Sequence, residues 1–215
     1  MTMMNRRSVS RWALGLATAA SLGLPAWAAD EAPDALIKRL SVDVLETLRT
    51  DKSIKSGDIP QIVALVDKTV MPHVNFRRMT AAAVGPGWRQ ATPEQQARLQ
   101  AEFKTLLVRT YAGALAQVSD QSITVKPLRA MPEDKDVLVR TEIRGRGDPV
   151  QLDYRLEKTP GEGAGWKVYN LNVLGVWLVE TYRNQFAPEV NAKGVQGLID
   201  ALVARNKANA EGTKK

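Results

Sequence analysis

Residues 165–186 constrain the fold more than any other stretch, because two hydrophobic periodicities meet inside them. Residues 166–173 alternate and are rich in aromatic and β-branched side chains, which predicts a β-strand. After Gly175, apolar residues recur every four positions, which predicts a helix that packs on an apolar surface. Gly175 suits the turn between them because it has no Cβ atom. The predicted strand faces are Trp166, Val168 and Asn170 on one side and Lys167, Tyr169, Leu171 and Val173 on the other, and the helix stripe is Leu178, Val179, Tyr182 and Phe186.

The first 28 residues have the features of a secretory signal peptide. Basic residues precede a short apolar run over residues 12–24, and Ala26-Trp27-Ala28 fits a small-residue cleavage site. The run is shorter than a transmembrane helix requires and is followed by Pro25. We therefore expect a periplasmic mature protein that begins at Ala29. The pair Arg6-Arg7 fits a twin-arginine signal only in part, so the export route stays open.

Charge and cysteine content limit the class of protein. The net charge is +7, and three of the basic residues lie in the predicted signal peptide. No basic run interleaved with aromatic residues remains, so nucleic acid is not an expected partner. The chain has no cysteine, so its core and not disulfides must hold it together. The remaining length predicts one monomeric domain over residues 29–205, followed by a polar, disordered tail over residues 206–215.

The first half of the mature chain predicts amphipathic helices. Thr92 is expected to start the longest of them, because Pro93 suits the first helical position and Gln95 completes a capping box. Its apolar stripe is broad enough to face either a core or a ligand. The predicted helices cover residues 34–50, follow the N-cap Asp58, cover 76–84 up to Gly85-Pro86-Gly87, and start at Thr92.

Alternating apolar residues predict strands from Ser122 onward. Glycine-rich turns separate the later strands, which favours an antiparallel meander. Charged residues alternate along 150–157, so one sheet face meets water and helices must cover the other. The prediction is an α+β fold: a twisted, mainly antiparallel sheet of about four strands, packed against several helices that enclose an apolar pocket. A break near Pro188 is expected to separate a helix from Trp177 and a last amphipathic helix.

The chain offers few groups for catalysis. Its single histidine, His73, has no cysteine or patterned acids beside it, and a zinc site needs three or four ligands. No nucleophile elbow, HExxH motif or phosphate loop occurs. Glu142 and Asp153 alternate with apolar residues and are expected to face solvent. We therefore predict no catalytic residue, no metal and no enzymatic activity.

Several spaced motifs resemble those of the MlaC, or toluene-tolerance, family. They are Gly87-Trp88-Arg89-x-Ala91-Thr92, Trp166-Lys-Val-Tyr-Asn170, Gly175-Val176 and Tyr182-Arg183-x-Gln185-Phe186. Asn170 stands where the family usually has Asp, and Trp177 where a small residue is common. The resemblance implies a periplasmic phospholipid carrier that maintains outer-membrane lipid asymmetry, with phospholipid as cargo and no cofactor. It implies two partners: an outer-membrane lipoprotein–porin complex and an inner-membrane ABC transporter with its substrate-binding hexamer.

Periodicity alone is compatible with a solid core or a hollow one, and the resemblance favours a hollow interior that holds acyl chains. Two alternatives remain: a small α+β cone enzyme acting on an apolar ligand, and a periplasmic adaptor that binds no lipid. The predicted lipid-binding residues are those expected on the inner faces of the strands and helices. They are Leu107, Tyr111, Leu115, Val139, Thr141, Leu152, Tyr154, Val168, Trp177, Leu178 and Tyr182.

Overall fold

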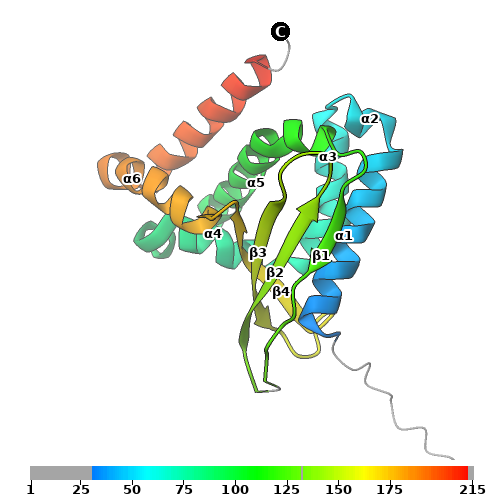
Figure 1. Cartoon of the computed structure of the whole chain (residues 1–215). Coiled ribbons are helices and arrows are strands. Elements are labelled where there is room, and N and C mark those ends of the chain that lie inside the picture. Colours follow the sequence, from blue (N-terminus) through cyan, green and yellow to red (C-terminus); the bar gives the residue numbers. More distant parts are fainter. Residues whose placement is uncertain (1–30, 132, 213–215) are drawn as a thin grey trace, which may run out of the picture.

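A computed structural model describes residues 31–131 and 133–212, and the predicted signal peptide lies outside them. The chain forms one antiparallel sheet with helices behind one of its faces (Figure 1). This arrangement confirms the predicted α+β fold. The strands follow one another in the order β1-β2-β3-β4-β5, each antiparallel to the next. They are β1 (Ser122–Val125), β2 (Asp136–Arg144), β3 (Val150–Lys158), β4 (Trp166–Val173) and the two-residue β5 (Val176–Trp177).

The helices begin where the sequence provides caps. The Asp58 side chain accepts a hydrogen bond from the Gln61 N–H, and Thr92 and Gln95 form the reciprocal capping box. The α-helices are α1 (Pro33–Thr50), α2 (Lys52–Lys55), α3 (Ile59–Leu65), α4 (Phe76–Val84), α5 (Pro93–Ala116) and α6 (Leu178–Gly212). Shorter turns link them: a π-helical turn (Val66–Val70) and two 3-10 turns (Met71–His73 and Gly85–Arg89).

The C-terminal helix differs from the prediction in two ways. The helical geometry breaks at Gly194 (φ 67°, ψ −169°), whereas Pro188 lies inside the helix, so the predicted break at Pro188 is wrong. Glycine adopts a positive φ that other residues avoid. The helix also continues through Asn206 to Gly212, into the segment predicted to be a disordered tail. Asn206 is buried, and its amide donates hydrogen bonds to the backbone oxygen and carboxylate of Glu102, which ties this turn to α5.

A β-bulge in β4 changes which side chains face the helices. Leu156 pairs with Val168, but the preceding residue Arg155 pairs with Asn170, so Tyr169 is an extra residue in β4. Because an extra residue reverses the alternation, the predicted strand faces are wrong beyond Tyr169. Leu171 and Val173 share the inner face with Val168, whereas Asn170 and Asn172 turn to the outer face.

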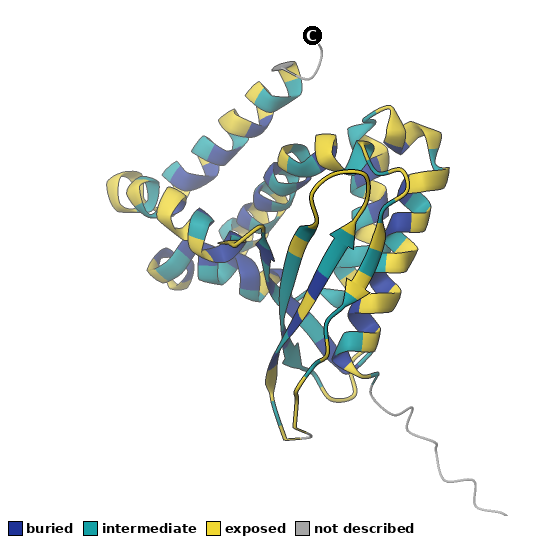
Figure 2. Cartoon of the chain, in the orientation of Figure 1, coloured by how far each residue is buried: buried dark blue, intermediate teal, exposed yellow. Residues whose placement is uncertain are grey.

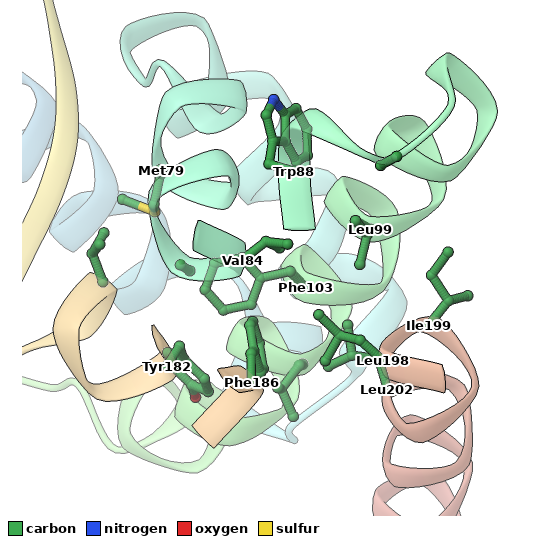
Figure 3. Packing of buried hydrophobic residues seen from close by; sticks show 14 of the residues in the cluster. Met79, Val84, Trp88, Leu99, Phe103, Tyr182, Phe186, Leu198, Ile199 and Leu202 are labelled. Atoms are coloured by element: carbon green, nitrogen blue, oxygen red, sulfur yellow. The ribbon is translucent and has the colours of Figure 1, made fainter. Parts of the chain in front are cut away.

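The buried apolar residues form three separate clusters instead of one core. The aromatic cluster joins α4, α5 and α6 around Phe103, which lies 4.9 Å from Tyr182 and 5.3 Å from Phe186 between ring centroids (Figure 3). The sheet cluster packs the start of α1 on the inner face of the sheet, through Ile37 and Leu156. The helical cluster joins the end of α1, α2, α3 and α5. Single domains more often have one contiguous core, so the region where these three clusters meet is of functional interest.

The β4–β5 turn contains the one non-glycine residue with a positive φ in the described part of the chain. Leu174 has φ 52° and is 62% exposed. A left-handed conformation costs most residues roughly 1–2 kcal/mol, whereas asparagine tolerates it better. We expect Leu174→Asn to raise the free energy of unfolding by about 0.5–1 kcal/mol in urea denaturation. Val176→Thr, at a neighbouring exposed position without positive φ, is the control and should be nearly neutral. A loss of stability in Leu174→Asn would contradict this account.

Candidate functional site

Strand pairing arranges the inner face of the sheet in rows, each with one residue from β2, β3 and β4. The first row lies in the sheet cluster: Val137 is 6% exposed, Leu156 0% and Val168 5%. The sheet is therefore fully covered at this end. The first row is Val137, Leu156 and Val168, the second is Val139, Tyr154 and Leu171, and the third is Thr141, Leu152 and Val173.

The second and third rows are covered less completely. Val139 and Thr141 on β2 are buried, but all four residues from β3 and β4 retain accessible surface. Tyr154 and Leu152 lie on β3, which has a neighbouring strand on either side, so solvent does not reach them from a sheet edge. Figure 2 shows that most of β3 has intermediate exposure and that little of it is buried. The helices therefore leave part of the inner face of β3 accessible.

Helix α5 packs on the same aromatic cluster as Leu171 and Val173 of β4. Its residues Leu99, Phe103 and Leu106 are buried, whereas Leu107 and Tyr111 are half-buried. The helix packs chiefly on α6, α3, α4 and α2, with no strand among these main neighbours in the described chain. We use the name inner seam for the half-buried apolar residues between the three clusters. They are Leu107, Tyr111, Leu115, Leu152, Tyr154, Leu171 and Val173.

The structure places the predicted lipid-binding residues in three groups. Those in the inner seam are Leu107, Tyr111, Leu115, Leu152 and Tyr154. Those on adjoining inner surfaces but buried are Val139, Thr141, Val168, Leu178 and Tyr182. Trp177 is not brought to the inner face. It pairs with Asn172 on the outer face, where the guanidinium of Arg155 lies 4.3 Å from its ring centroid.

Sequence reasoning missed Leu171 and Val173. Both lie on the inner face and pack against the aromatic cluster. Strict alternation assigned them to the face opposite Val168, and no residue in the sequence marks the bulge at Tyr169. The polar pair Asn170 and Asn172 is the available signal, because two asparagines on an inner apolar face are unfavourable without partners.

Asn170 has a structural role at the start of α6. Its Oδ1 accepts hydrogen bonds from the N–H groups of Val179 (3.2 Å) and Leu171 (2.9 Å), and its amide donates to Glu180 (2.8 Å). Val179 is in the first turn of α6, where backbone N–H groups have no partner inside the helix. A side chain of β4 thus caps the helix that follows it.

Two hydroxyl groups lie within the inner seam, those of Tyr111 and Tyr154. The hydroxyl of Tyr154 lies beside the side chains of Ser41 on α1 and Thr141 on β2, and burial raises its pKa. The Thr141 hydroxyl also donates to the Leu152 carbonyl oxygen at 3.0 Å. Burial likewise raises the pKa of Tyr111, and the nearby Tyr182 adds to the shift. Both phenols are therefore neutral at physiological pH.

Acidic side chains lie on the other face of the described sheet. On that face Asp153 pairs with Arg140, and Glu157 pairs with Asp136 on one side and Lys167 on the other. Within residues 31–131 and 133–212, no three His, Cys, Asp or Glu side chains are placed to hold a metal ion. No helix in this part of the chain is long and apolar enough to cross a membrane. The inner seam is thus an apolar surface with hydroxyl groups and no carboxylate.

Comparison with known proteins shows which family this chain belongs to. The family description "MlaC protein" matches residues 38–204. The chain belongs to the MlaC family. It is 28% identical over 168 residues to the toluene tolerance protein ttg2D of Pseudomonas putida, covering 77% of this chain and 76% of that protein. It is 22% identical over 176 residues to the intermembrane phospholipid transport system binding protein MlaC of Haemophilus influenzae, covering 81% and 82% respectively.

A solved structure supports both the family and the fold. The phospholipid-binding protein of Ralstonia solanacearum, in complex with a phospholipid, is 47% identical with a TM-score of 0.78. The match covers 82% of this chain and 98% of that one. The sheet and helices described above thus form the fold of an MlaC-family protein.

Two leucines on β3 test whether the seam is unfilled. Leu156 is fully buried in the first row, whereas Leu152 is half-buried in the third. We expect Leu156→Ala to lower the free energy of unfolding by about 2–5 kcal/mol, because it leaves a cavity in packed surroundings. Leu152→Ala should cost only about 1 kcal/mol in lipid-free protein, since fewer contacts are lost. Equal losses in urea denaturation would show that the seam is as tightly packed as the sheet cluster.

Proposed function

We propose that this chain is a periplasmic phospholipid carrier whose inner seam holds the acyl chains of its cargo. The observation that carries the proposal is the accessible apolar surface on the inner face of β3, a strand with neighbours on both sides. Natural interiors are close-packed, so an unfilled apolar surface between sheet and helices suits a hydrocarbon ligand. The phospholipid in the similar Ralstonia solanacearum protein supports this proposal.

Hydrocarbon burial explains how such a carrier retains its cargo. Each buried methylene group is worth about 0.8 kcal/mol relative to water, so two acyl chains of ordinary length represent on the order of 20 kcal/mol. Spontaneous escape into water is therefore very slow. Exchange with another hydrocarbon environment is close to balanced, because one apolar surrounding replaces another. Direction then depends on the partner complexes and on any ATP hydrolysis they perform.

The partners follow from this role. The carrier exchanges lipid with an outer-membrane lipoprotein–porin complex and with an inner-membrane ABC transporter and its substrate-binding hexamer, and so maintains outer-membrane lipid asymmetry. The name of the Haemophilus influenzae relative, a binding protein of an intermembrane phospholipid transport system, supports this part of the proposal.

The carrier is not an enzyme in this proposal. A cone-shaped enzyme acting on an apolar ligand needs an acid and a hydroxyl group in its pocket. Tyr154 supplies a hydroxyl, but Asp153 and Glu157 on the same strand face outward. Phospholipid is the cargo, and the proposed role requires no cofactor.

Lipid extraction tests the proposal directly. The mature protein is purified without detergent, and an organic extract is analysed by mass spectrometry. We expect stoichiometric phospholipid, because its acyl chains cannot leave for water on the time scale of purification. Removal of this lipid by a mild detergent should lower the melting temperature, since a ligand that binds only the folded state stabilises it. An extract without phospholipid would contradict the carrier role and favour a lipid-free adaptor.

A charged substitution in the seam tests which surface meets the lipid. We expect Leu152→Lys to reduce the lipid content of the purified protein at least tenfold, because a buried ammonium group is costly beside hydrocarbon. Gln151→Lys is the matched control, since Gln151 is the exposed neighbour on the same strand. Circular dichroism checks that both variants fold. Full lipid content in a folded Leu152→Lys variant would remove Leu152 from the lipid site.

A further inference from the structure

The inner face of the sheet changes from packed to accessible at one position along the strands. In the first row, Leu156 and Val168 are 0% and 5% exposed. One row further on, Tyr154 and Leu171 retain accessible surface, and the third row does so through Leu152. On β3 and β4 the packed end of the inner face therefore stops at Tyr154 and the accessible part starts there, whereas Val139 and Thr141 on β2 stay buried.

The side chain of Tyr154 crosses the interior at this boundary. It leaves β3 on the inner face, and its hydroxyl lies beside Ser41 of α1 and Thr141 of β2. Ser41 lies one helical turn beyond Ile37, which is fully buried in the sheet cluster. Thr141 is fully buried on β2 in the third row. The phenol ring thus spans the distance between the sheet and α1, directly above the packed first row.

We infer that Tyr154 forms the floor of the acyl-binding region and sets how far a fatty-acid chain enters, and hence which chain lengths the protein accepts. The inference rests on the proposed carrier function and specifies the selectivity of the same site.

Two properties make Tyr154 a firm floor. A chain that pushed the ring aside would move its hydroxyl away from the polar side chains of Ser41 and Thr141 and into hydrocarbon, and a hydroxyl buried without a polar partner is costly. Displacing the ring also opens no further space, because Leu156 and Val168 beneath it are packed against α1. The terminal methyl group of a bound chain therefore ends at the ring.

The test uses lipid-free protein loaded from vesicles made of equimolar dimyristoyl- and distearoyl-phosphatidylglycerol. Bound lipid is extracted and the ratio of long to short species is measured by mass spectrometry. We expect Tyr154→Ala to raise this ratio by about fourfold for each additional methylene group that the enlarged space buries. Tyr154→Phe is the matched control. It keeps the ring and loses only the hydroxyl, so the ratio should stay near that of the wild type.

A second variant, expected to change the lipid ratio in the opposite direction, keeps the inference testable if Tyr154→Ala does not fold. Leu152→Phe adds bulk in the third row, above Tyr154, and should lower the ratio of long to short species. A wild-type protein that takes up no phospholipid contradicts the proposed function, and this inference with it. Phospholipid uptake by the wild type with an unchanged ratio in Leu152→Phe, or in a folded Tyr154→Ala variant, overturns the inference alone.

Discussion

The extra residue at Tyr169 is the constraint on which the arrangement of the site depends. Beyond this bulge, Asn170 faces outward, where its side chain caps the first turn of α6. Leu171 faces inward, where it lines the seam. A regular strand would reverse both: the amide would lie unpaired among apolar side chains, and the leucine would take the outer position from which Asn170 caps α6. One inserted residue therefore both positions the covering helix and completes the apolar wall beneath it.

The three clusters hold the fold together around an inner sheet face that the helices cover only in part. Phe103 and its aromatic neighbours hold α4, α5 and α6 together, and Leu156 with Ile37 holds α1 on the sheet. Neither set depends on the seam residues being covered. The seam itself contributes little when empty, since its apolar surface lacks contacts on one side. In the proposed carrier, hydrocarbon supplies those contacts, so the same surface that adds little to folding provides the affinity for cargo.

The sequence predicted where the helices and strands lie better than it predicted which of their side chains face inward. Alternation located β2, β3 and β4, and the capping box at Thr92 located the start of α5. It also predicted Leu152 and Tyr154 on the helix-facing side, which strand pairing confirms. Alternation alone did not predict the bulge, because Tyr169 is as compatible with a regular strand as with a bulged one; the available signal was the polar pair Asn170 and Asn172. The outward position of Trp177 was missed for a related reason. Two residues of β5 pair with β4 before the helix starts, and so short a strand has no period to detect.

The chemistry of the seam favours selection by hydrocarbon shape over selection by charge. Its polar features are the hydroxyls of Tyr111 and Tyr154, and the Tyr154 hydroxyl lies beside Ser41 and Thr141 of the protein itself. With no carboxylate on that face, the proposed carrier holds its cargo through apolar area, which is non-directional and grows with each methylene group. In this proposal the head group stays near solvent, and the depth of the interior limits the length of the chains.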